Sequence, residues 1–372
     1  MNCDVAVIGA GPAGLCAAIE AAKCGAMVTM IDEAAGPGGQ LCKQTHKFFG
    51  GTEHKAGTRG IDIASQLTKE AEKCGVEMVL DTTVWGIFEN NLLSLYRKNS
   101  ANGNRIQNLQ AQKILIATGA LENTLAFPGW TLPGVMGAGA AQTMVNVHRV
   151  AVGNRVLMLG SGNVGLIVSY QLIQAGAEVV GVIEILPNVG GYWVHASKIT
   201  RLGVPIFTSH AVKEVQGDGK VEMATIMEVD SHSNFLPGTE KIFDVDTVCI
   251  SVGLSPLAEL AWMGGCEFMY LPKLGGFVPV HDENMETTVR GIYIAGDAAG
   301  IEEASTAMMQ GAIAGLAASE SLGYLSKKDY EKLKKDKLQS TGAFRRGMFE
   351  FRSIARKEFD RKEGKVRQWL RE

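Results

Sequence analysis

Short apolar runs alternate with helix-like stretches from the first residues of the chain onward. An apolar run over residues 5–8 is followed by closely spaced glycines, an Ala-rich stretch to Gly25, and a second apolar run over residues 28–31. Apolar runs of this length bounded by glycine are typical of buried strands. The order therefore predicts a strand–helix–strand unit with two parallel strands.

The pattern continues with elements of both kinds. An amphipathic helix is predicted over residues 61–75, where Ile61, Ala64, Leu67 and Ala71 recur at three- or four-residue spacing. Strands are predicted over residues 78–88 and 92–96, and the polar residues 98–104 predict a turn. A further buried strand is predicted over residues 113–119 and ends in Thr and Gly.

Residues 155–184 repeat the opening pattern. A strand from Arg155 leads into closely spaced glycines, a helix is predicted through Gln174, and a strand over residues 177–183 ends in Glu184. Such an internal repeat predicts two copies of one supersecondary unit. Downstream, strands are predicted over residues 248–253 and 288–297, followed by a helix from about residue 302 to residue 322.

The glycines of the first unit have the spacing of a dinucleotide-binding turn. The first glycine permits a tight turn, the second lets the backbone approach a pyrophosphate, and the third lets the helix pack closely on the strand. Asp32 ends the second strand 18 residues after Gly14 (32 − 14), where it would accept a hydrogen bond from a ribose hydroxyl. The predicted cofactor-binding residues here are Gly9, Gly11, Pro12, Ala13, Gly14, Asp32 and Glu33.

The second unit has the same signature, with its acid 19 residues after the last glycine (184 − 165). Two such units predict two dinucleotides, and passing a hydride between them is the simplest reason to hold both. The alternative is that the second unit is a scaffold or holds a structural adenine nucleotide. Its predicted nucleotide-binding residues are Gly160, Ser161, Gly162, Asn163, Val164 and Glu184.

Composition narrows the class of protein. The chain has 372 residues, enough for two or three domains, and its 45 glycines cluster at strand–helix turns. A formal net charge of −3 gives no electrostatic case for a nucleic-acid partner. No apolar run reaches the ~20 residues of a membrane-spanning helix, and the first strand begins too early for a signal peptide. We therefore expect a cytoplasmic protein without a membrane span.

The seven cysteines do not have the spacing of a redox pair or a metal site. No two of them form a Cys-x-x-Cys motif, and no Cys/His pair has zinc or iron–sulfur spacing. Cys42 alone lies near predicted chemistry, and it is a weak catalytic candidate. We expect reduced thiols, no metal, and no protein nucleophile.

The two glycine turns and two of the strand ends together match the motifs of a known family. In chain order the motifs are Gly9-x-Gly11-x-x-Gly14, Ala117-Thr118-Gly119, Gly160-x-Gly162-x-x-Gly165 and Ala295-Gly296-Asp297. Over residues 3–325 the chain resembles the two-dinucleotide-binding-domain flavoproteins of the glutathione and thioredoxin reductase superfamily. The resemblance implies an α/β fold of two Rossmann-like domains, noncovalent FAD in the first and NAD(P) in the second, facing the flavin.

The resemblance also implies the domain order. An FAD-binding domain comprises residues 1–120 and 271–325, and an NAD(P)-binding domain with its linkers, residues 121–270, is inserted into it. Asp297 is expected near the ribityl group, and the start of the following helix is expected to favour negative charge at the flavin's pyrimidine edge. The further implied cofactor-binding residues are Gly39, Gln40, Leu41, Val84, Ala117, Thr118, Gly119, Gly253, Gly296, Asp297, Ala304 and Ser305.

The chain lacks the redox cysteines of the disulfide reductases. Cys42 follows a Gly-Gly-Gln-Leu turn, but no second cysteine follows it, as a Cys-x4-Cys would require. The turn and the segment over residues 117–142 look instead like the α subunits of sarcosine oxidase, proline dehydrogenase, opine oxidase and hydrogen cyanide synthase. Such an α subunit partners a flavin-containing β subunit that oxidises an amine or amino acid. This chain lacks the added iron–sulfur segment or large domains of many relatives.

The tail over residues 326–372 lies outside the core resemblance. It holds 16 Lys and Arg against 8 Asp and Glu, with large apolar residues among them, Phe344, Met348, Phe349, Phe351, Ile354 and Trp369. It is predicted to be a partly helical surface segment, and the alternatives are a docking arm for a partner or a segment folded over its own core.

The sequence thus predicts an FAD-dependent oxidoreductase that exchanges a hydride with NAD(H). Its expected role is the electron-handling subunit of an amino-acid or secondary-amine dehydrogenase hetero-oligomer, which would include a small iron–sulfur protein. Two alternatives remain open: a stand-alone NADH-dependent reductase of a small iron–sulfur carrier, and a non-catalytic subunit with a structural adenine nucleotide in the second site.

Overall fold

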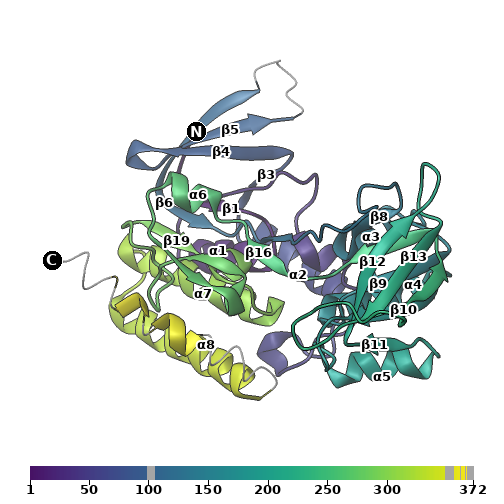
Figure 1. Ribbon diagram of the computed structural model, residues 1–372. Helices are drawn as coiled ribbons and strands as arrows, with labels where there is room; N and C mark the ends of the chain where they lie inside the picture. The colour runs from purple at the N-terminus through teal and green to yellow at the C-terminus, as the bar shows by residue number, and fades with distance from the viewer. Residues whose placement is uncertain (99–104, 348–355, 361, 365, 367–372) are drawn as a thin grey trace. The chain divides into compact units, whose positions relative to one another are not determined.

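The computed structural model describes residues 1–98, 105–347, 356–360, 362–364 and 366. It divides into two compact units, one made of residues 1–121 and 255–372 and the other of residues 122–254 (Figure 1). The second unit is therefore inserted into the first. The chain passes between them through β7 (Ala120–Glu122) and β16 (Leu254–Pro256), which pair with each other.

The first unit is built on a seven-stranded sheet in the order β3-β2-β1-β6-β5-β4, with β19 also paired to β6. β1, β2, β3, β6 and β19 run parallel, and β4 and β5 continue the sheet antiparallel. A parallel sheet with its strands buried on both faces needs helices to cover it. The strands are β1 (Asn2–Ile8), β2 (Val28–Ile31), β3 (Glu77–Val79), β4 (Thr82–Phe88), β5 (Leu92–Arg97), β6 (Ile106–Ile116) and β19 (Ile292–Ile294).

Two helices of the first unit cross at very short range. A Cβ on Gly311 would lie 2.0 Å from the Ala13 carbonyl oxygen, and one on Gly315 would lie 2.3 Å from the Ala17 carbonyl oxygen. The glycines therefore let α7 approach the backbone of α1 (Figure 1). The helices of this unit are α1 (Pro12–Lys23), α2 (Gly60–Lys73), α6 (Glu259–Met263), α7 (Ala304–Ser321) and α8 (Lys327–Gly347); a hairpin of β17 (Phe268–Leu271) and β18 (Gly276–Pro279) completes it.

The second unit has its own five-stranded sheet, in the order β11-β10-β9-β15-β8 with every pair parallel. Beside this sheet the chain forms a three-stranded antiparallel sheet, β12-β13-β14, which the sequence pattern did not predict. The elements are β8 (Val135–Gly137), α3 (Ala138–Asn146), β9 (Arg155–Leu159), α4 (Asn163–Gln174), β10 (Glu178–Glu184), α5 (Trp193–Arg201), β11 (Ile206–Thr208), β12 (His210–Gln216), β13 (Met223–Glu228), β14 (Lys241–Asp244) and β15 (Thr247–Ile250).

The two-domain α/β fold expected from the sequence is confirmed, and the elements differ in detail. The strand predicted over residues 78–88 is two strands, because Asp81 takes a left-handed conformation (φ 51°) between β3 and β4. The predicted strand over residues 288–297 contains only β19 at its centre. Residues 255–270 cluster with the first unit, since Ala261 and Cys266 are buried in its core. The turn predicted over residues 98–104 lies largely outside the described residues.

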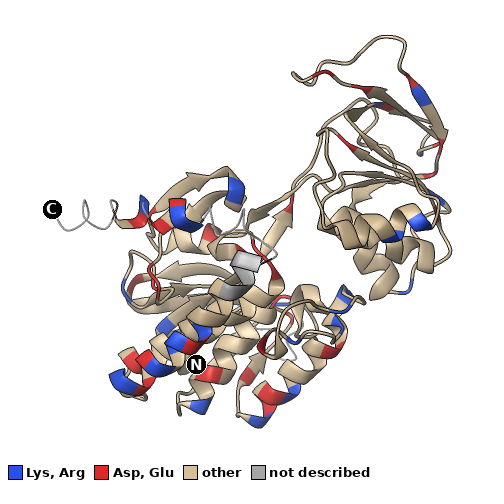
Figure 2. Ribbon diagram, turned by 90° about the horizontal axis from the view of Figure 1, so that it is seen from below, with Lys and Arg blue, Asp and Glu red and all other residues tan. Residues whose placement is uncertain are grey.

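The described part of the tail packs against the first unit. Tyr330 and Lys334 on α8 are both buried; the Tyr330 hydroxyl donates to Asn284 Oδ1 at 2.6 Å, and Lys334 forms a 2.6 Å ion pair with Glu283. Charged residues of both signs occur along this helix (Figure 2). Of the large apolar residues named for the tail, Phe344 lies in α8 but the structure does not describe its side chain, and the other five lie outside the described residues.

Among the helices that the structure describes, none combines the length and the apolar character that crossing a bilayer requires.

Candidate functional site: two glycine turns

The first glycine turn, between β1 and α1, leaves no room for two side chains. Gly9 has φ 105°, and a Cβ there would lie 2.3 Å from the Ala117 carbonyl oxygen. A Cβ on Gly14 would lie 1.8 Å from the carbonyl oxygen of Gly9. Both glycines are therefore required by the fold itself, because each contact is with backbone that cannot move aside.

Gly11 differs from its neighbours. Its backbone is extended (φ −76°), and a Cβ there would meet no protein atom within 4 Å. It is also the N-cap of α1, and it offers no side chain to the free N–H groups of the first turn, where Pro12 occupies the first position. The N-terminus of α1 therefore presents open space and backbone N–H groups that have no partner within the helix, the arrangement that holds a pyrophosphate.

Asp32 follows β2 and fixes the turn from the other side. Its Oδ2 accepts from the Ala10 N–H at 2.6 Å, and its Oδ1 accepts from the Ala34 N–H at 2.8 Å. Asp32 is half-buried. The neighbouring Glu33 side chain is exposed, and its carbonyl accepts from Lys98.

The Gly-Gly turn after β2 returns to the first glycine turn. The Gly38 N–H donates to the Ala10 carbonyl oxygen at 2.8 Å, and a Cβ on Gly39 would lie 2.7 Å from the Cα of Gly11. Gly39 and Gln40 are exposed there, whereas Leu41 is fully buried in the core. The structure thus brings Gly39 beside Gly11.

Residues after β6 pass over the same turn. The Ala117 N–H donates to the Ile8 carbonyl at 2.8 Å, and the Thr118 hydroxyl donates to the Leu257 carbonyl. Gly119 has φ 83°, which favours glycine. Val84, also predicted to contact the cofactor, lies in β4 at an irregular register with β5 and is buried.

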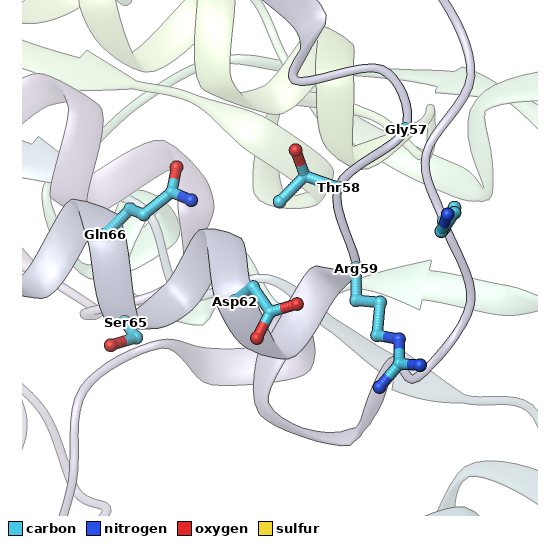
Figure 3. A pocket seen from close by; sticks show the side chains of 7 residues that line it. Gly57, Thr58, Arg59, Asp62, Ser65 and Gln66 are labelled. Carbon is cyan, nitrogen blue, oxygen red and sulfur yellow. The ribbon is translucent and has the colours of Figure 1, made fainter.

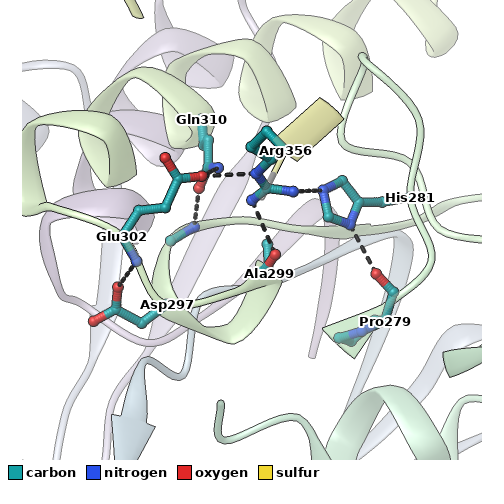
Figure 4. Close-up of polar contacts among 8 residues, drawn as sticks. Pro279, His281, Asp297, Ala299, Glu302, Gln310 and Arg356 are labelled. Carbon is teal, nitrogen blue, oxygen red and sulfur yellow. Dashed lines mark hydrogen bonds and ion pairs between the residues drawn. The ribbon is translucent and has the colours of Figure 1, made fainter. Parts of the chain in front are cut away.

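The Gly296–Asp297 turn, which lies between β19 and α7, contacts the start of α1 at the first glycine turn. Gly296 has φ 72°, and a Cβ there would lie 2.9 Å from the Cβ of Ala13. Its N–H donates to Gln310 Oε1 at 2.9 Å, and Asp297 Oδ1 accepts from the Glu302 N–H at 3.3 Å (Figure 4). α7 begins at Ala304, and its N-cap Glu303 forms no side-chain cap hydrogen bond. Ser305, in the first turn of α7, is buried.

The second glycine turn, between β9 and α4, makes the same kinds of contact as the first turn. Gly160 has φ 104°, and its Cβ would lie 2.1 Å from the Ser251 carbonyl oxygen, as that of Gly9 would from Ala117. The Ser251 N–H donates to the Leu159 carbonyl at 2.7 Å. Gly162, the N-cap of α4, faces open space as Gly11 does, and it leads directly into Asn163 and Val164.

Glu184 holds the second turn as Asp32 holds the first. Its Oε2 accepts from the Ser161 N–H at 3.0 Å, and its Oε1 accepts from the Leu186 N–H at 3.0 Å. The Ser161 hydroxyl adds a 2.5 Å donation to Oε2 and accepts from the Gly190 N–H at 3.0 Å. Glu184 is buried, and these hydrogen bonds hold its carboxyl group at the turn.

Sequence reasoning missed the Gly-Gly pair of the second unit. The Gly191 N–H donates to the Ser161 carbonyl at 2.8 Å, as Gly38 does to Ala10, and the Tyr192 N–H donates to Asn163 Oδ1 at 2.9 Å. The signal was present, because each pair begins six residues after its acid (38 − 32 and 190 − 184). Gly253, the predicted strand-end glycine, has φ 119°, and a Cβ there would lie 3.0 Å from Asn123 Nδ2.

Cys42 is poorly placed for thiol chemistry. Its Sγ donates to the Pro37 carbonyl at 3.4 Å, and burial, with a smaller contribution from Asp32, raises the pKa of the thiol. Since the thiolate is the reactive form, the raised pKa lowers its reactivity at neutral pH. All seven cysteines are free thiols in the structure.

A pocket of about 460 Å³ lies at the start of α2 (Figure 3). Its lining includes Thr58, Arg59 and Asp62, and none of its residues belongs to either glycine turn. We therefore do not assign it to a cofactor.

Comparison with known proteins identifies the family. Residues 3–311 match the pyridine nucleotide-disulphide oxidoreductase family. The chain belongs to this family. Membership makes it an FAD-dependent oxidoreductase, and the family implies FAD and NAD(P) as the cofactors.

Relatives within the family are named as subunits. The chain is 28% identical over 338 residues to an opine oxidase subunit of Agrobacterium tumefaciens, covering 87% of this chain and 66% of that protein. It is 25% identical to the alpha subunit of sarcosine oxidase of Corynebacterium sp., covering 87% of this chain but only 33% of the relative. It is 28% identical to the HcnB subunit of hydrogen cyanide synthase of Pseudomonas aeruginosa, covering 85% and 70%.

Solved structures show the same fold. Thioredoxin reductase of T. acidophilum matches with a TM-score of 0.69 and 22% identity, covering 86% of this chain and 99% of that chain. L-proline dehydrogenase of P. horikoshii matches with a TM-score of 0.67 and 24% identity, covering 90% and 59%. The expected family and fold are thereby confirmed.

Proposed function

We propose that this flavoprotein holds FAD at the first glycine turn, binds NAD(H) at the second, and exchanges a hydride between them. The observation that carries the proposal is the duplication of the turn. Gly11 and Gly162 both face open space at the N-terminus of a helix without a side-chain cap, while their neighbouring glycines are sterically required. A unit kept only as scaffold has no physical need of that open N-terminus.

The residues present fit FAD in the first unit. The N–H groups at the start of α1 would face the pyrophosphate, Asp32 would accept from a ribose hydroxyl, and Asp297 would accept from the ribityl chain. The N-terminus of α7 would place positive partial charge toward the cofactor's ring. When bound, FAD supplies the two-electron chemistry, so the protein contributes position and electrostatics.

Glu184 is expected to favour NADH over NADPH. Its contacts hold a buried carboxylate at the turn, and a 2′-phosphate brought to that carboxylate would meet like charge. Lys198, a cation that could have offset this charge, lies over the ring of Tyr170 instead. We expect at least about a tenfold preference in kcat/KM for flavin reduction, equivalent to about 1.4 kcal/mol.

The measurement is anaerobic reduction of the flavin by each nucleotide, in the intact chain and in Glu184→Gln. The glutamine keeps an oxygen acceptor for the Ser161 N–H but removes the charge, so the preference should narrow in the variant. Equal reduction of the wild-type flavin by NADPH and NADH would show that Glu184 does not set the choice.

We further propose that the chain is the electron-handling subunit of an amino-acid or amine-oxidising complex with a flavin-containing partner and a small iron–sulfur protein. The names of the relatives as subunits support this role. Both glycine turns are already assigned to cofactors, so the oxidised amine needs a site elsewhere.

Assembly can be tested by native mass spectrometry of the chain purified alone and after co-expression with the candidate partner encoded beside it. The proposal predicts a stable hetero-oligomer that oxidises an amine, and a lone chain that oxidises none. A lone monomer that turns over an amine with an artificial acceptor would contradict the subunit role.

A further inference from the structure

Arg356, from the C-terminal segment, is buried beside the Gly296–Asp297 turn of the first unit. Its Nε donates to Glu302 Oε1 at 2.7 Å, and its Nη2 donates to the Ala299 carbonyl at 3.0 Å (Figure 4). The guanidinium also lies 5.0 Å from the ring centroid of Phe359, which is itself buried. This segment follows the family-matched region, residues 3–311, and its role in the site was not visible in the sequence.

His281 accepts a third hydrogen bond from the Arg356 guanidinium. Its Nδ1 lies 2.8 Å from the Pro279 carbonyl, which can only accept, so Nδ1 carries the proton. The Nε2 is then the acceptor for Arg356 Nη1 at 3.0 Å. The planar fork of Arg356 therefore meets three acceptors, two from the segment over residues 299–302 and one from His281, in a fixed geometry that a lysine ammonium lacks.

Two of the residues that accept from Arg356, Glu302 and Ala299, belong to the segment that holds Asp297. Glu302, bound by Nε, donates its backbone N–H to Asp297 Oδ1 at 3.3 Å. Ala299, bound by Nη2, lies in the 3-10 helix η5 (Gly296–Ala299) that contains Asp297. Gln310 completes the network, since it donates to Glu302 at 3.5 Å and accepts from the Gly296 N–H.

Burial raises the cost of breaking the ion pair between Arg356 and Glu302. The side chains of Arg356 and Glu302 are 8% and 3% exposed, so neither charge can turn to water if its partner is lost. Removing one member of a buried ion pair leaves an uncompensated charge. The surrounding backbone must then move so that this charge reaches water or another partner. The backbone that would move here is the Asp297 turn and the start of α7.

We propose that Arg356 is a positioning residue for FAD: it locks the Asp297 turn and the N-terminus of α7 from a segment outside the family-matched region. The proposal rests on the assignment of FAD to the first unit. Arg356 acts through Glu302 and Ala299 and need not touch the cofactor. The C-terminal segment thereby becomes part of the FAD-binding machinery.

The test compares Arg356→Met with Lys362→Met in apoprotein titrated with FAD and followed by flavin fluorescence. Lys362 lies on the same segment and pairs with Glu358 at 2.9 Å, but both side chains are well exposed, so its loss should leave the Kd for FAD unchanged. Arg356→Met should raise the Kd at least about tenfold. Hydrogen exchange in the apoprotein should rise over residues 296–303 and stay unchanged over residues 327–342 of α8.

A double variant separates positioning from general damage. Glu302→Gln removes the partner charge while keeping the backbone N–H that binds Asp297, so Arg356→Met should cost less in that background than alone. If Arg356→Met fails to fold by circular dichroism, Arg356→Lys decides the question, because it keeps the charge but loses the fork and should still weaken FAD binding.

The experiment distinguishes a failure of the FAD assignment from a failure of the role proposed for Arg356. A wild-type chain that binds no FAD overturns the FAD assignment itself. A wild-type chain that binds FAD, with an Arg356→Met or Arg356→Lys variant that binds it equally well, overturns only the role of Arg356. Uniform exchange increases across the first unit, with no local change at residues 296–303, would also contradict positioning.

Discussion

Gly11→Val should yield a folded protein that no longer retains FAD. A Cβ at this position meets no protein atom within 4 Å, and the extended backbone there suits any residue, so the fold should tolerate the change. Glycine provides no side-chain cap to α1, so the valine removes none. The branched side chain would fill the space proposed for the pyrophosphate, which lowers the affinity for FAD roughly 100-fold or more.

The measurement is the ratio of flavin to protein after purification, with circular dichroism and the melting temperature of the apoprotein as the record of folding. Gly14→Val is the contrasting control, because its Cβ would overlap the Gly9 carbonyl oxygen at 1.8 Å and should prevent folding. A Gly11→Val protein with full yellow colour would show that the pyrophosphate does not lie at this turn.

Gly162→Val should keep FAD and lose reduction by NADH. The geometry is that of Gly11: a helix N-cap with extended backbone (φ −66°) and no protein atom within 4 Å of a Cβ. Because the change lies in the second unit, the FAD content of the first should be unaffected. Flavin reduction by NADH should fall roughly 100-fold or more, since the valine occupies the proposed pyrophosphate space.

Stopped-flow absorbance of the flavin under anaerobic conditions measures this loss, and the two variants control for each other. Gly11→Val should remove flavin, whereas Gly162→Val should keep it in a form that NADH cannot reduce. If Gly162→Val is reduced as fast as the wild type, the nicotinamide nucleotide does not bind at the second turn.

The glycine turns could be predicted from the sequence because their requirements are local. Gly9 and Gly160 have φ values of 105° and 104°, which favour glycine, and a Cβ on Gly14 would overlap the carbonyl oxygen of Gly9. These requirements arise within the turn itself, so the glycine spacing is visible in the sequence. The acids Asp32 and Glu184 end strands at nearly equal offsets, and the structure places both on the backbone N–H that follows the first glycine. Local chemistry of this kind can be inferred from spacing alone.

The features that sequence reasoning missed have weak signals in the sequence, either because they depend on contacts between distant residues or because the hydrophobic pattern is interrupted. Arg356 and Glu302 are 54 positions apart, and in the sequence Arg356 is one of many cations in a basic tail. The break at Asp81 was missed because apolar residues lie on both sides of it, so residues 78–88 resemble a single strand. The strands of the sheet β12-β13-β14 mix polar and charged residues with apolar ones, a weaker pattern than the apolar runs of the buried parallel strands.

The most direct test of hydride exchange between the two nucleotides is anaerobic mixing of the purified wild-type chain with NADH while the flavin absorbance is followed. The flavin band should bleach, with about one equivalent of NADH consumed per FAD, because both are two-electron carriers. No bleaching, together with an adenine nucleotide that stays bound to the second unit through purification, would contradict hydride exchange and would show that the second turn is a structural site.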